Sequence, residues 1–86
     1  MINTNKIFTI LPNKTKIEYD VVLTFKSEIN NKNYVIYTDN NYDSNKKLRI
    51  FAGIYNPNDN IYLGEPTTKE EWNEIILTLD NTLLQQ

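Results

Sequence analysis

The sequence predicts an α+β fold, an antiparallel meander of four or five strands packed on one face by a single C-terminal helix. Residues 17–26 alternate apolar and polar side chains, which is the pattern of a half-buried strand. Four further apolar runs are separated by segments rich in Asn, Asp, Pro or Ser, which favour turns. After Pro66 the spacing of apolar residues changes to three and four, which is typical of a helix.

The strand at residues 17–26 organises the rest of the chain. Its polar residues Glu18, Asp20 and Thr24 occupy even positions, so they share one face. The odd positions form one apolar face, which is made of Ile17, Tyr19, Val21, Leu23 and Phe25. We expect this odd face to pack on the helix, which places Val22 on the opposite face.

The other strands are expected at residues 6–11, 33–39, 48–55 and 61–63. Gly53 predicts either a bulge or the close approach of another element, because glycine has no side chain to pack within a strand. Pro66 makes the last segment an edge strand, because proline cannot donate a hydrogen bond to a neighbouring strand.

The helix is expected at residues 68–84. Thr67 or Thr68 can serve as the N-cap, and Glu70 or Glu71, three residues later, completes a capping box. One apolar stripe follows the helical period, and it consists of Trp72, Ile75, Ile76, Leu79 and Leu83. We expect this stripe to bury against the sheet, so truncation of the chain before Trp72 should unfold it.

The composition limits the chemistry of the chain. Its 86 residues are expected to form one domain, residues 1–86, around one core. There is no Cys and no His, which removes disulfides, thiolate chemistry, Cys/His zinc sites and histidine acid–base catalysis. No other set of acid, base and nucleophile can be assembled, so we expect no enzyme activity, no catalytic residue and no cofactor.

The longest polar loop resembles the start of a calcium site. Asp39, Asn41 and Asp43 stand at positions one, three and five of such a loop. Ser44 replaces the glycine required at position six, and Ile50 replaces the bidentate glutamate required at position twelve. We therefore expect no metal site and interpret the stretch as a solvated hairpin end.

The charge distribution bears on possible partners. The net charge is −2 and no basic run is present, which argues against nucleic-acid binding. From Glu65 onward five acidic residues accompany a single lysine, which favours a basic protein partner, although a solvated helix face explains the same charges. No signal-peptide pattern and no apolar run long enough to span a membrane is present, so we expect a cytoplasmic protein.

Several segments in a fixed order carry a resemblance. They are EYDVVLTF, KNYVIYTDN and LRIFAGIYNPNDN, then a short run ending in EP, and EEWNEI at the start of the helix. This order, from about residue 7 to 84, resembles the YrzB-like domain of unknown function 1292 family, small proteins of low-GC Gram-positive bacteria and mycoplasmas. The resemblance implies a bacterial cytoplasmic setting and supplies no catalytic residue.

A single helix can cover only one face of the sheet. The other face gathers aromatic residues, and we expect it to be exposed and to bind a partner protein or a second copy of the chain. The predicted partner-binding residues are Tyr37, Phe51, Tyr55, Phe8 and Tyr62. The alternative is a single-stranded RNA-binding module that stacks bases on the same face, which predicts salt-dependent RNA binding.

Overall fold

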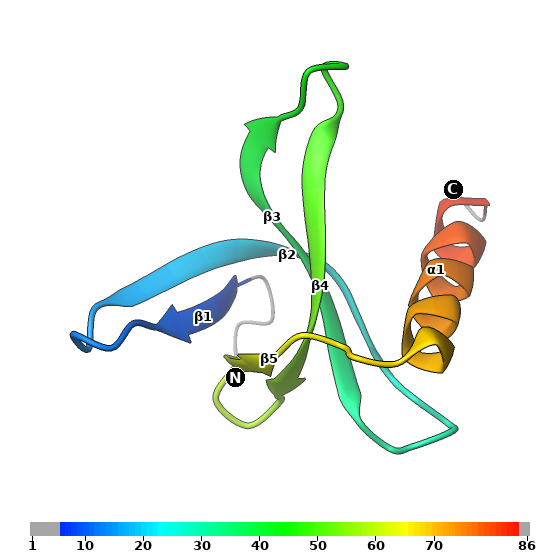
Figure 1. Ribbon diagram of the computed structural model, residues 1–86, viewed down its shortest axis with the longest axis horizontal. Coiled ribbons are helices and arrows are strands. Elements are labelled where there is room, and N and C mark those ends of the chain that lie inside the picture. The colour runs from blue at the N-terminus through cyan, green and yellow to red at the C-terminus, as the bar shows by residue number, and fades with distance from the viewer. Residues whose placement is uncertain (1–5, 85–86) are drawn as a thin grey trace.

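The computed structural model describes residues 6–84 and shows five strands followed by one helix (Figure 1). The strands are β1 (Lys6–Ile10), β2 (Lys16–Lys26), β3 (Asn33–Tyr42), β4 (Leu48–Asn56) and β5 (Ile61–Gly64), and the helix is α1 (Lys69–Leu84). The predicted α+β class, with strands first and a C-terminal helix, is confirmed. Helix α1 is too short and too polar to cross a membrane, and the described residues contain no other helix.

The sheet is a closed barrel, so the predicted open meander is wrong. Consecutive strands pair antiparallel, as in a meander, but β1 also meets β5 in a parallel contact. This closing contact pairs Phe8 with Ile61, and the N–H of Phe8 donates to the carbonyl of Asn60 at 2.8 Å. Closure joins the two edges of the meander and turns one face of the sheet inward.

A bulge in β2 divides that strand between the two faces of the sheet. Val21 pairs with Tyr37. Leu23 pairs with the preceding residue of β3, Ile36, so Val22 is the extra residue of the bulge. Because adjacent residues of β3 point to opposite faces, Val21 and Leu23 also point to opposite faces. The expected single odd face of β2 is therefore wrong: its first half faces the barrel interior, and its second half faces α1.

Apolar residues are buried on both faces of the sheet. On the inner face, Ile7 of β1 and Val35 of β3 are almost completely buried. On the outer face, Tyr34 and Ile36 of β3 form a cluster with Ile75 of α1. Partly buried residues surround this outer cluster, and they are Leu23, Phe25, Ala52, Ile54 and Leu79. Helix α1 thus covers the outer face over β2, β3 and β4, beside the barrel in Figure 1.

The loop between β3 and β4 is shorter than predicted. The strand expected at residues 33–39 continues to Tyr42, because Tyr42 pairs with Leu48. In the remaining turn, Asp43 Oδ1 accepts hydrogen bonds from the N–H groups of Asn45 and Lys47, at 2.8 and 3.0 Å. Within residues 6–84, no three His, Cys, Asp or Glu side chains come together as metal ligands could.

The N-terminus of α1 forms the predicted capping box with Thr68 and Glu71. The N–H of Glu71 donates to Thr68 Oγ1 at 3.1 Å, and the N–H of Thr68 donates to Glu71 Oε1 at 3.3 Å. The predicted buried stripe is only partly correct. Ile75 is buried and Leu79 half-buried, but Trp72 and Ile76 are exposed, and the side chain of Leu83 lies outside the described part of the structure.

Candidate protein interface

The five predicted partner-binding residues do not share one exposed face. Four lie on the inner face of the barrel: Tyr37, Phe51, Tyr55 and Tyr62. Phe8 points outward, because its neighbour Ile7 points inward, and Lys16 Nζ lies 4.1 Å from its ring centroid. All five are half-buried. The expectation of an exposed aromatic face is wrong, because closure of the barrel turns that face inward. Binding by these residues stays a prediction.

Tyr37 is the centre of an aromatic cluster on the inner face. Its ring centroid lies 5.2 Å from that of Tyr19, 5.6 Å from that of Phe51 and 5.9 Å from that of Tyr62. Gly53 makes room for one of these rings, since a Cβ atom there would lie 2.2 Å from Cε2 of Tyr62. The predicted close approach at Gly53 is confirmed, and the aromatic rings pack on one another.

Burial, and to a lesser extent the neighbouring Tyr62 and Tyr19, raise the pKa of Tyr37 to about 12. The unfolded chain ionises Tyr37 near the ordinary pKa of 10.0, whereas the folded protein keeps its proton to higher pH. The stabilising contribution of neutral Tyr37 is therefore complete below pH 10 and is lost as the pH rises toward 12.

We expect an ultraviolet titration of the native protein to show a tyrosine that ionises near pH 12 and that is absent from Tyr37→Phe. The variant should also lose less stability than the native protein above pH 10, because it has no proton to release at this position. Superimposable titrations of the two proteins would contradict the assignment.

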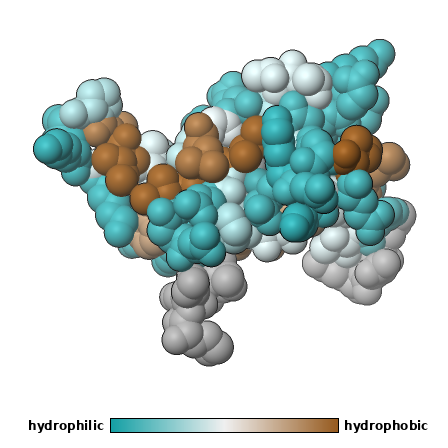
Figure 2. Space-filling model, turned by 90° about the horizontal axis from the view of Figure 1, so that it is seen from below, coloured by the Kyte–Doolittle hydropathy of each residue, from teal (hydrophilic) through white to brown (hydrophobic). Residues whose placement is uncertain are grey.

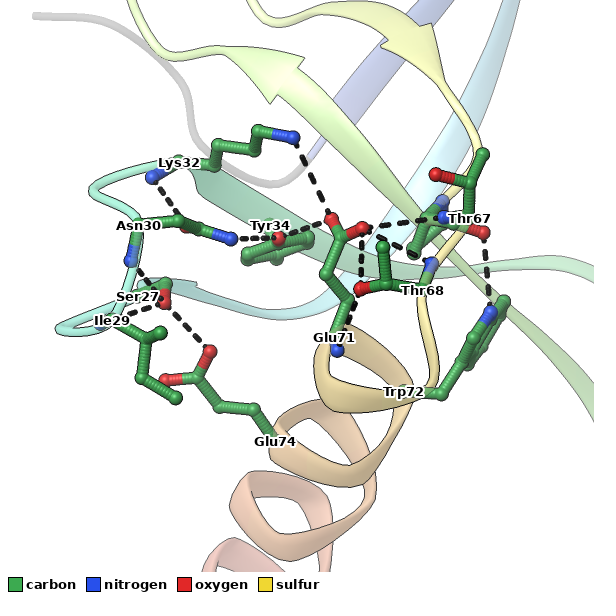
Figure 3. A network of polar contacts seen from close by, with 11 residues as sticks. Ser27, Ile29, Asn30, Lys32, Tyr34, Thr67, Thr68, Glu71, Trp72 and Glu74 are labelled. Carbon is green, nitrogen blue, oxygen red and sulfur yellow. Dashed lines mark hydrogen bonds and ion pairs between the residues drawn. The ribbon is translucent and has the colours of Figure 1, made fainter.

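A buried carboxylate joins α1 to the turn between β2 and β3 (Figure 3). Glu71 is only 5% exposed, and it accepts a hydrogen bond from the hydroxyl of Tyr34. Its other oxygen accepts from Thr68 Oγ1 at 2.9 Å, and Lys32 Nζ lies 3.9 Å from the carboxylate. These contacts, led by the Tyr34 hydroxyl, lower the pKa of Glu71, so the buried carboxylate stays ionised.

A second contact fastens the next turn of α1 to the same β2–β3 turn. Ser27 Oγ donates to Glu74 Oε1 at 2.7 Å and accepts from the N–H of Ile29 at 3.1 Å. Asn30 Nδ2 donates to the Tyr34 hydroxyl at 2.9 Å. Figure 3 shows these side chains as one continuous polar network between the turn and the helix. The sequence predicted the capping role of Glu71 but gave no signal for its contact with Tyr34, which is distant in the chain.

This network determines which side of α1 faces solvent. With Glu71 and Ile75 buried, Trp72 is 39% exposed and Ile76 is 53% exposed. The indole of Trp72 is held in place, because its Nε1–H donates to the carbonyl of Pro66 at 3.1 Å. Residues four apart lie on the same face of a helix. Trp72 and Ile76 therefore form a continuous exposed apolar surface, which we call the Trp72–Ile76 side.

Charged residues lie beside the Trp72–Ile76 side. Lys69 stands one turn before Trp72, and Asp80 stands one turn after Ile76, and both are exposed. Over its length α1 carries one lysine and four acidic residues, Glu70, Glu71, Glu74 and Asp80. Of these four, Glu70 and Asp80 are exposed, whereas Glu71 is buried beside Tyr34 and Glu74 accepts from Ser27.

Apolar side chains are also exposed at two places in the sheet. Ile10 and Leu11 are exposed on the β1–β2 hairpin, and hydrophobic surface gathers at that end of the molecule, at the left of Figure 2. Tyr42, Leu48 and Ile50 are exposed on the outer part of the β3–β4 ribbon, which projects beyond the barrel at the top of Figure 1.

Comparison with known proteins identifies relatives in Bacillus. No family model matches the chain. A UPF0473 protein of Bacillus pumilus (strain SAFR-032) is 40% identical over 70 residues, which cover 78% of this chain and 73% of that protein. The chain belongs to the UPF0473 family. A UPF0473 protein of Bacillus velezensis is 33% identical over 70 residues, which cover 78% of this chain and 75% of that protein. No solved structure matches the UPF0473 chain.

The resemblance predicted a family of small bacterial proteins, and the relatives confirm this. They do not confirm the YrzB-like name. In this UPF0473 chain, Trp72 and Ile76 are exposed on one side of α1. Both are held on a helix that the Glu71 network fixes to the barrel.

Proposed function

We propose that this protein is a non-enzymatic protein-interaction module of the bacterial cytoplasm, and that its partner binds the Trp72–Ile76 side of α1. The exposure of Trp72 carries the proposal: its indole is 39% exposed on a helix that buries its neighbours Glu71 and Ile75. Tryptophan is the residue type most enriched among those that dominate binding energy at protein interfaces. Its hydrogen bond to Pro66 reduces the side-chain freedom that binding would otherwise remove.

The charge of α1 indicates the chemistry of the partner. The exposed acidic residues Glu70 and Asp80 of α1 favour a partner surface that carries Lys or Arg around an apolar pocket. Electrostatic complementarity of this kind mainly accelerates association, so binding should weaken as salt concentration rises. The family resemblance to YrzB-like proteins fits the proposed bacterial setting and is retained as a prediction.

The proposal is tested by capture from a nuclease-treated Bacillus pumilus lysate, followed by reconstitution of the complex from purified components. The test variant is Trp72→Ser with Ile76→Ser. The matched control is Leu77→Ser, which removes a leucine that is 63% exposed on another side of the same helix. Circular dichroism and thermal unfolding check that each variant is folded.

We expect the native protein and Leu77→Ser to bind the same purified partner, and the double variant to lose at least about tenfold in affinity, since a central tryptophan contributes about 2 kcal/mol or more. Undiminished binding by the folded double variant would refute this surface. Capture from an untreated lysate that disappears after nuclease treatment would favour the RNA-binding alternative. In the same assay, Phe8→Ser and Tyr55→Ser test the aromatic contacts predicted from the sequence.

A further inference from the structure

Part of one edge of β4 has no strand beside it among residues 6–84. Strand β4 is paired with β3 as far as Leu48, but on its other edge β5 pairs only with Ile54, Tyr55 and Asn56. Within residues 6–84, the segment from Leu48 to Gly53 therefore has no strand partner on this edge. Natural proteins usually protect such an edge with proline, a bulge, charged residues or a covering element, because it can pair with another chain.

The backbone groups on this free edge can be assigned. The carbonyl of Arg49 accepts a hydrogen bond from Thr38 Oγ1 of β3 at 2.6 Å, so Arg49 turns its backbone toward β3. The backbone groups of successive strand residues point to opposite edges. Those of Leu48, Ile50 and Ala52 therefore point to the free edge.

The side chains at this edge are apolar on the outer face. Leu48 is 40% exposed and Ile50 is 44% exposed, and Tyr42, paired with Leu48, is exposed beside them. Within residues 6–84, no third strand pairs with the outer part of the β3–β4 ribbon. A two-stranded ribbon is only marginally stable in water, so a third strand at this edge would stabilise it.

The segment is complementary to itself in antiparallel orientation. With Ile50 opposite Ile50 of a second copy, Leu48 lies opposite Ala52, so each residue that directs its backbone to the free edge meets another such residue. Arg49 then lies opposite Phe51 of the second copy, and not opposite another arginine. The two side chains are suited to contact, since the Arg49 guanidinium already lies 5.2 Å from the ring centroid of Phe51 in its own chain.

The neighbouring strand leaves room for this pairing. The paired segment runs from Leu48 to Ala52 and stops two residues before Ile54, where β5 begins to occupy the edge. We propose that β4 pairs antiparallel with β4 of a second copy of this chain, centred on Ile50, and so joins two β3–β4 ribbons into a four-stranded sheet. This inference goes beyond the proposed function, because it uses a different surface from the Trp72–Ile76 side.

The first test measures mass in solution by sedimentation equilibrium over a wide range of protein concentration. The native mass should rise from 10.1 kDa toward twice that value. Ile50→Lys should remain at the monomer mass, because it places two ammonium groups opposite each other across the two-fold axis. Ile29→Lys, which changes an exposed isoleucine in the β2–β3 turn, should dimerise as the native protein does.

The second test reports the register directly. The natural chain has no cysteine, so Ile50→Cys introduces a single thiol. In a hydrogen-bonded antiparallel pair the two Cα atoms are about 5.5 Å apart, within the disulfide range of about 4.4–6.8 Å. Oxidation should link Ile50→Cys into covalent dimers at least about tenfold faster than Ile29→Cys, which places its thiol at a more exposed position far from the edge. A monomeric native protein, dimerisation that survives Ile50→Lys, or equal cross-linking of the two cysteine variants would each overturn the proposal.

Discussion

Replacement of Ile75 by alanine is expected to lower the free energy of unfolding by about 2–5 kcal/mol. Ile75 is 3% exposed and joins α1 to Tyr34 and Ile36 on the outer face of the barrel. Its truncation would leave a cavity at the centre of the contact between helix and sheet. Chemical denaturation followed by circular dichroism gives the free-energy difference directly.

The adjacent residue supplies a matched control. Ile76→Ala removes the same atoms from a side chain that is 53% exposed, so it should change the free energy of unfolding by no more than about 0.5 kcal/mol. The sequence pattern placed both residues in one buried stripe. Equal losses of unfolding free energy in the two variants would support the predicted buried stripe and contradict the observed orientation of α1.

Glu71→Gln is expected to lower the free energy of unfolding by about 1–3 kcal/mol at neutral pH, because it removes the charge from buried hydrogen bonds that a carboxylate makes. The carboxylate accepts from the Tyr34 hydroxyl, Thr68 Oγ1 and the N–H groups of Thr67 and Thr68. Glu70→Gln, an exposed change one residue earlier, should alter stability by no more than about 0.5 kcal/mol.

The effect of Glu71→Gln should depend on pH. The pKa of Glu71 is lowered in the folded protein, so its stabilising contribution is complete above the ordinary glutamate pKa of 4.5 and is lost as the pH falls below that value. The stability of the native protein and the variant should therefore converge in acid. A difference that stays constant from neutral pH to well below 4.5 would contradict the role assigned to the carboxylate.

The elements could be predicted from the sequence because local patterns determine them. The alternation in residues 17–26 predicted β2, and the Thr68–Glu71 spacing predicted the capping box. Barrel closure could not be predicted in this way, since it depends on the contact of Phe8 with Ile61, far apart in the chain. The bulge at Val22 was not predicted either, because a single apolar residue at an even position is also compatible with continued alternation, which places Val22 on the polar face.

The candidate interface was predicted less well than the elements. Periodicity showed that Trp72, Ile75 and Ile76 share one side of the helix, but it could not fix the rotation of the helix against the sheet. That rotation is set by Glu71, whose partner Tyr34 lies 37 residues away. Hydrophobicity alone places Trp72 in the core and Glu71 in solvent, whereas the structure buries the glutamate and exposes the tryptophan.

The bulge at Val22 divides the side chains of β2 between two layers of the protein. Residues before it supply side chains to the barrel interior, and residues after it supply side chains to the contact with α1. Loss of a single codon at this point would remove no charged or buried group, since Val22 is exposed. It would also leave Val21 opposite Tyr37 and Leu23 opposite Ile36, so both halves of the strand would keep their layers. A shift in length is therefore tolerated at Val22, whereas the loss of a residue elsewhere in β2 would send the side chains on one side of it to the wrong layer.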